Sequence, residues 1–130
     1  MNNIESFGNE IKHVYNLNTY SVRCHIANRD WWVDPETKQP IKRNKGELIA
    51  LMHSELSEAL EGMRKNSMDD KIPYRLQEEV ELADLLIRLF DYAGGFGLDL
   101  NGAFEDKMEY NANRADHKLE NRAKKDGKKF

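Results

Sequence analysis

The stretch ELIALMHSELSEALEGMR, residues 47–64, decides the fold, together with a second stretch, LQEEVELADLLIRLFDYA, residues 76–93. In both, apolar residues recur at helical spacing, which predicts two helices. The second stretch is apolar around most of its circumference, as in a helix that is buried on nearly all sides. The sequence therefore predicts a helical core built on this pair.

Each predicted helix carries two acids three residues apart, and such residues share one face of a helix. On a helical wheel Glu55 lies inside the apolar arc of the first helix and Glu58 lies at its edge. Glu81 and Asp84 lie in a polar stripe of the second helix that is roughly 80° wide. Carboxylates on core-facing surfaces are costly unless something pairs with them. Mg²⁺ or Mn²⁺, which prefer oxygen ligands, would remove that cost, so we predict a metal centre.

The alternative to a metal is a network of salt bridges between the helices, which would use Arg88, Arg64 and Lys65. Two acidic pairs, each in apolar surroundings, favour the metal. Asp91 lies three residues after Arg88 on the same stripe, and we expect it to pair with Arg88 rather than with a metal.

Composition indicates one soluble helical domain. The 130 residues are 39% hydrophobic and 33% charged, with a net charge of −3. Residues 114–130 contain seven basic and three acidic residues, so this segment carries a net charge of +4 and residues 1–113 carry −7. We predict a domain at residues 1–114 and a basic C-terminal tail at residues 115–130. The acidic body argues against nucleic acid as the main partner.

No apolar run approaches the ~20 residues of a membrane span, so we expect no membrane partner. The polar start Met1-Asn2-Asn3 is no signal peptide, and we expect a cytoplasmic protein. Cys24 is the only cysteine, which excludes an internal disulfide and argues against a thiolate metal site.

The remaining segments also favour helices. Residues 5–28 predict a first helix or two joined helices, and residues 100–114 predict a last helix that Asp99 or Asn101 would cap. Asn44, three positions before Glu47, is a predicted N-cap for the helix at residues 47–64. No strand pattern is visible, and the predicted fold class is all-α.

Three sequence elements follow one another along the chain: Glu55-Leu56-Ser57-Glu58, Glu81-Leu82-Ala83-Asp84 and KMEYNANR at residues 107–114. Together they resemble the MazG-like, all-α nucleoside triphosphate pyrophosphohydrolases. The family pattern is ExxE, a variable gap and then ExxD, which the first two elements match. The third resembles the family's KxxxNxxR element. The resemblance covers residues 44 to 114, with the three elements in the family's order. Some members have a second Glu where this chain has Ser54, which leaves the general base open.

The resemblance implies a small four-helix, MazG-like bundle that forms homodimers or homotetramers. It implies that Glu55, Glu58, Glu81 and Asp84 are catalytic and bind Mg²⁺, with Mn²⁺ as an alternative. It further implies that the phosphates of a nucleoside triphosphate contact Lys107, Asn111 and Arg114. The reaction would be attack of water on the α-phosphorus, giving a nucleoside monophosphate and pyrophosphate. This activity would serve nucleotide pool control or house-cleaning, with deoxynucleoside triphosphates as the family's usual substrates.

Trp31 and Trp32 lie in a polar loop, and one ring could stack on the nucleobase, with Trp32 preferred over Trp31, or both could anchor the packing. Two other functions stay open. One is an enzyme related to the phosphoribosyl-ATP pyrophosphohydrolases, which share the scaffold. The other is a non-catalytic helical interaction protein whose acids form salt bridges.

Overall fold

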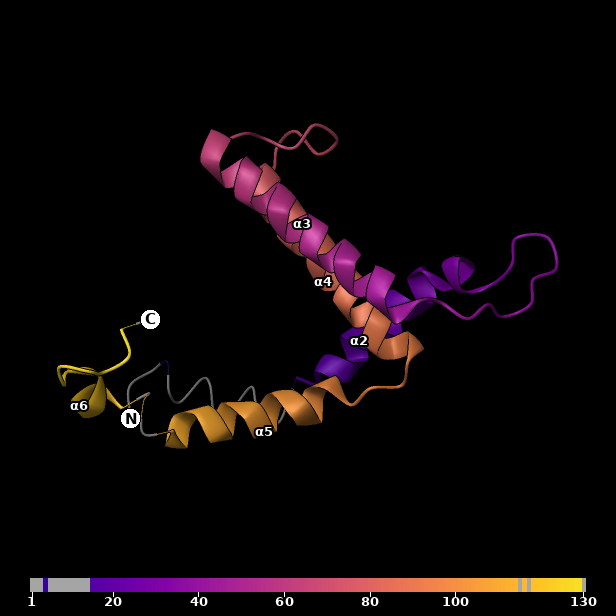
Figure 1. Cartoon of the computed structure of the whole chain (residues 1–130). Helices are drawn as coiled ribbons and strands as arrows, with labels where there is room; N and C mark the ends of the chain where they lie inside the picture. Colours follow the sequence, from indigo (N-terminus) through magenta and orange to yellow (C-terminus); the bar gives the residue numbers. More distant parts are fainter. Residues whose placement is uncertain (1–3, 5–14, 115, 117, 130) are drawn as a thin grey trace. The chain divides into compact units, whose positions relative to one another are not determined.

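The computed structural model describes residue 4, residues 15–114, residue 116 and residues 118–129. These residues form five α-helices and one short 3-10 helix, with no strand among them (Figure 1). The predicted all-α class is confirmed for this part of the chain. The helix predicted at residues 5–28 is seen as α2, Leu17–Ala27; its predicted residues 5–14 lie outside the described residues.

The chain divides into two compact units, residues 1–98 and residues 99–130. The predicted domain boundary at residue 114 lies inside the second unit.

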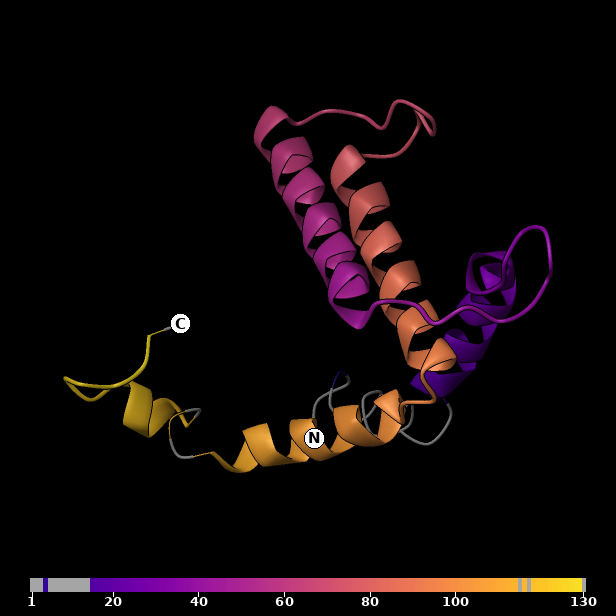
Figure 2. The same cartoon turned by 45° about the vertical axis from the view of Figure 1, so that its right-hand side comes forward.

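The first unit is built on an antiparallel pair of helices, α3 (Lys45–Lys65) and α4 (Gln77–Gly95), which lie side by side (Figures 1 and 2). Asn44 caps α3 as predicted, because its side-chain oxygen accepts the backbone N–H of Glu47 at 3.0 Å. Asn66 ends α3 in the left-handed conformation, with φ of 49°.

A row of small and apolar side chains, together with one acid, forms the buried seam of α3. Its members follow one another at intervals of four, three, four and three residues: Leu48, Met52, Glu55, Ala59 and Gly62. At Gly62 an added Cβ would come within 2.9 Å of the Gln77 side chain, so the missing side chain lets α3 and α4 approach closely. Two members of the predicted polar stripe of α4, Gln77 and Arg88, contact α3.

Helix α2 packs against the C-terminal part of α4 (Figure 2). The rings of Tyr20 and Phe90 stack with their centroids 5.6 Å apart. A Cβ on Gly94 would collide with the backbone of Ser21, so glycine is needed for this contact. A 3-10 helix, η1 (Arg29–Trp32), follows α2 and brings two tryptophans to the same end of α4.

The second unit contains α5 (Leu100–Asn113) and the short α6 (Leu119–Arg122). Asp99 caps α5 as predicted, since its carboxylate accepts the backbone N–H of Gly102 at 2.9 Å. Among the helices that the structure describes, none is both long enough and apolar enough to cross a membrane.

Candidate functional site

Three of the four predicted metal ligands meet between α3 and α4. Glu55 of α3 and Glu81 and Asp84 of α4 each place one carboxylate oxygen so that all three lie within 4.8 Å of one another. We call these three residues the acidic cluster. Glu58, the fourth predicted ligand, is exposed and lies outside this group, although its carboxylate interacts with Glu81.

Two carboxyl groups of the acidic cluster have raised pKa values. Burial raises the pKa of Glu81 to about 7, and the neighbouring carboxylates of Glu55 and Glu58 contribute to the same rise. Burial and the charge of Glu55 also raise the pKa of Asp84, while the nearby guanidinium of Arg88 opposes this. The cluster therefore holds more negative charge than its surroundings compensate, and three convergent carboxylate oxygens are a donor set that suits Mg²⁺ or Mn²⁺.

One cation does contact the acidic cluster. Nε of Arg88 donates to Oε1 of Glu55 at 2.6 Å. The other two cations of the predicted salt-bridge network, Arg64 and Lys65, pair instead with Glu61 on their own helix, at 3.7 and 2.9 Å. The bridge between the helices is thus made by Arg88.

The predicted pairing of Arg88 with Asp91 is wrong. Asp91 is buried, and its carboxylate accepts a hydrogen bond from the indole N–H of Trp32 and lies 2.9 Å from Nδ1 of His25. The prediction failed because α2 and η1 bring these partners from a distant part of the sequence, which leaves Arg88 to reach across to α3.

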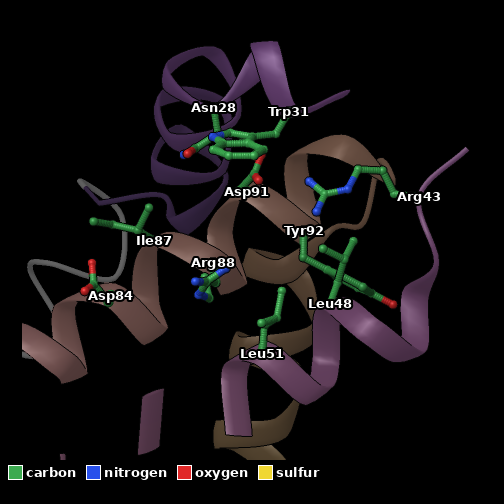
Figure 3. Close-up of a pocket in the computed structure, with 10 residues that line it drawn as sticks. All are labelled: Asn28, Trp31, Arg43, Leu48, Leu51, Asp84, Ile87, Arg88, Asp91 and Tyr92. Atoms are coloured by element: carbon green, nitrogen blue, oxygen red, sulfur yellow. The ribbon is translucent and has the colours of Figure 1, made fainter. Parts of the chain in front are cut away.

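A pocket of about 440 Å³ lies beside the acidic cluster and shares Asp84 with it (Figure 3). It is formed by η1, the segment before α3, and helices α3 and α4. Its lining residues are Asn28, Trp31, Arg43, Leu48, Leu51, Asp84, Ile87, Arg88, Asp91 and Tyr92. The pocket thus combines aromatic and aliphatic surface with two guanidinium groups.

The two predicted base-binding tryptophans have different surroundings. Trp31 lines the pocket and is 70% exposed, so its ring is available for a ligand. Trp32 is not among the lining residues. Its indole packs edge-on against Phe96 and His25, and the Arg43 guanidinium lies 5.3 Å from its ring centroid.

Sequence reasoning did not find Asn28, Arg43 or Tyr92 as site residues, and it gave Arg88 only a salt-bridge role. Arg88 could have been found, because it lies one helical turn after Asp84 on the same polar stripe. Nothing in the spacing of Asn28 and Arg43 connects them with α4, so only the packing of the loop reveals them.

The three predicted phosphate-binding residues belong to the second unit. Nζ of Lys107 lies 4.7 Å from the ring centroid of Tyr110, and Cζ of Arg114 lies 5.9 Å from it. Arg114 also donates two hydrogen bonds to the carboxylate of Asp116, at 2.9 and 2.6 Å. Oδ1 of Asn111 is buried without a hydrogen-bond partner among the described residues. Lys107 and Arg114 are thus close to the same aromatic ring.

A scan against protein-family models finds no match for this chain, and searches of curated proteins and of solved structures find no significant similarity.

Proposed function

We propose that this protein is a Mg²⁺-dependent nucleoside triphosphate pyrophosphohydrolase of the MazG-like type. The proposal rests on two neighbouring features of the structure, the acidic cluster and the pocket. The acidic cluster, a candidate site for a divalent cation, adjoins a pocket that has an exposed indole and two guanidinium groups.

Glu55, Glu81 and Asp84 would hold the cation, and the exposed Glu58 lies close enough to Glu81 to take part. When bound, a divalent cation in such a site lowers the pKa of water and stabilises charge on phosphate oxygens. The residues fit this role because they offer carboxylate oxygens alone, on two helices whose contact fixes their spacing. The Glu55 side chain is only 8% exposed, which limits its freedom to turn away.

The pocket has aromatic and positively charged groups that suit the base and the phosphates of a nucleotide. The exposed face of Trp31 offers a stacking surface for a base, while Arg43 and Arg88 offer donors for phosphate oxygens. Asp84 belongs to both the pocket and the acidic cluster, so a phosphate chain in the pocket would lie next to the candidate cation site. The preference for deoxynucleotides rests on the family resemblance alone.

In the second unit, Lys107, Asn111 and Arg114 are the residues that the resemblance assigns to the phosphates. The buried Oδ1 of Asn111, which has no hydrogen-bond partner among the described residues, supports a role beyond that of a solvated helix face. The role of Lys107 and Arg114 as positive charges for phosphate oxygens rests on the family resemblance.

We propose further that the protein is a homo-oligomer in which a second copy covers apolar rows of α3 and α4. Only four apolar side chains are buried among the described residues: Leu48, Met52, Ala59 and Ala93. On α3, Leu56, Leu60 and Met63 form an exposed row at helical spacing, and on α4 Leu82 and Leu86 do the same. Large exposed apolar surfaces mark interaction sites, and so small a core gives little stability to a single chain.

The experiment that tests the proposed activity measures pyrophosphate release from a panel of ribo- and deoxynucleoside triphosphates. It is run with Mg²⁺, with Mn²⁺ and with a chelator. We expect metal-dependent formation of monophosphate and pyrophosphate from one or a few substrates, and loss of at least about 100-fold in turnover in Glu81→Gln.

The control is Glu61→Gln, the same change on α3 at an acid whose ion-pair partners among the described residues, Arg64 and Lys65, lie on its own helix. Normal turnover by a folded Glu81→Gln protein would contradict the site assignment. Absence of turnover of every substrate, with a melting temperature that metal does not change, would instead favour the helical interaction protein.

A further inference from the structure

Arg88 connects the acidic cluster with the pocket. Its Nε donates to Glu55 at 2.6 Å, while Arg88 also lines the pocket and its side chain is 42% exposed. Among the residues that the structure describes, this is the ion pair that joins α3 to α4. Figure 3 shows Arg88 projecting from α4 into the space that the lining residues surround.

Two cations would compete for the Glu55 carboxylate: the guanidinium of Arg88 and a divalent cation bound to the acidic cluster. Glu55 is the most buried member of the acidic cluster and the partner of Arg88. A guanidinium and a divalent cation on the same carboxylate repel each other, because both charges lie within a few ångströms in partly buried surroundings where screening is weak. Binding of a divalent cation to the cluster therefore disfavours the contact of Arg88 with Glu55.

The position of Arg88 determines where its side chain goes when that contact breaks. The arginine side chain is long and half exposed, and the pocket lies directly beside it. A guanidinium released there is a fork of N–H donors that matches phosphate oxygens. The second guanidinium of the pocket, that of Arg43, lies over the Trp32 ring, so it does not compete for the acidic cluster.

We propose that Arg88 is an exchangeable cation: it neutralises Glu55 in the metal-free protein, and a divalent cation displaces it into the pocket, where it binds phosphate. This inference rests on the proposed function, since it takes the acidic cluster as the cation site and the pocket as the phosphate site. It makes Arg88 a switch that couples the two. Metal binding raises the affinity for phosphate, and phosphate binding raises the affinity for metal by the same factor.

The direct test observes the Nε–H group of Arg88 by NMR in the ¹⁵N-labelled full chain. Arg88→Lys identifies the resonance by removing it. Because the hydrogen bond to Glu55 is short and charge-assisted, we expect this proton to resonate downfield of those of solvated arginines. Saturating Mg²⁺ should abolish that shift, and inorganic triphosphate added after Mg²⁺ should produce a new one. A resonance that saturating Mg²⁺ leaves in place would overturn the exchange and make the pair a static link between the helices.

A second measurement is the affinity for Mn²⁺ of Arg88→Gln without any phosphate ligand. Removal of the competing cation should strengthen Mn²⁺ binding about tenfold, as expected from one charge-assisted hydrogen bond. In the unaltered protein, metal should increase the affinity for triphosphate. In Arg88→Gln this increase should be absent. Arg75→Gln is the matched control, because Arg75 lies just before α4, pairs with the exposed Glu79 in the first turn of that helix and does not line the pocket. It should change both affinities less than twofold.

The outcomes separate the two proposals. Mn²⁺ binding that Arg88→Gln leaves unchanged or weakens would overturn the exchange while the cation site stands. Failure of the unaltered protein and of Arg88→Gln to bind either metal would overturn the cation site, and the exchange with it. If Arg88→Gln does not fold, the NMR titration of the unaltered protein still decides the question.

Discussion

The indole N–H of Trp32 donates to both carboxylate oxygens of Asp91, at 3.0 and 3.2 Å. Asp91 is buried, and Nδ1 of His25 contacts the same carboxylate. These contacts attach α2 and η1 to the C-terminal part of α4. The exposed Trp31 is thereby held beside the pocket, because its neighbour in the chain is fixed.

Asp91→Asn should lower the free energy of unfolding by about 1–3 kcal/mol, because it weakens hydrogen bonds to a buried charged group. Denaturant unfolding of the two proteins gives the difference. Asp30→Asn, an exposed acid of η1, should change stability little. Equal stability of Asp91→Asn and the unaltered protein would show that the Trp32 and His25 contacts contribute nothing.

The metal-free protein should lose stability as the pH rises from about 4.5 to about 7. Glu81 has an ordinary pKa of 4.5 and a pKa of about 7 in the folded protein. The folded state therefore binds this proton more tightly than the unfolded state, and its stability falls across that window. Glu81→Gln, which is always neutral, should flatten this dependence and raise the melting temperature at pH 8 by roughly 5 °C.

Mg²⁺ should reverse the loss at pH 8 in the unaltered protein, because a ligand that binds the folded state stabilises it. Thermal melts at several pH values, with chelator and with Mg²⁺, test both effects. A flat profile for the metal-free unaltered protein would contradict the assigned pKa.

Trp31→Ala should weaken nucleotide binding about tenfold, which is the scale of base stacking on one aromatic ring. It should leave the melting temperature nearly unchanged, since the side chain is 70% exposed. Nucleotide titration and thermal melts measure the two effects. Tyr74→Ala is the control, as Tyr74 is 79% exposed and does not line the pocket. Equal affinities of the Trp31→Ala and Tyr74→Ala proteins would remove the base-stacking role.

Leu60→Glu combined with Leu86→Glu should convert the proposed oligomer to monomers. Each change places a charge in an apolar row that a second copy would bury. Light scattering after gel filtration gives the mass. Ile41→Glu, at an exposed position before α3, should leave the oligomer intact. A monomeric unaltered protein at micromolar concentration would end the proposal of a second copy.

The sequence by itself determined the helices and the polar stripe. Apolar residues at helical spacing placed α3 and α4, and Asn44 and Asp99 cap helices as predicted. These features depend on interactions between residues that lie close together in the sequence. For the same reason, the sequence placed Glu55, Glu81 and Asp84 on faces that could meet.

Only the tertiary structure decided which partners those charged groups take. Arg88 pairs with Glu55 across two helices, and Asp91 pairs with Trp32, 59 residues away in the chain. The pocket likewise needs η1 to pack on α4 before Trp31 and Arg88 can line one space. The local pattern fixes which face of a helix a side chain occupies, whereas the choice among partners depends on packing between segments that the sequence separates.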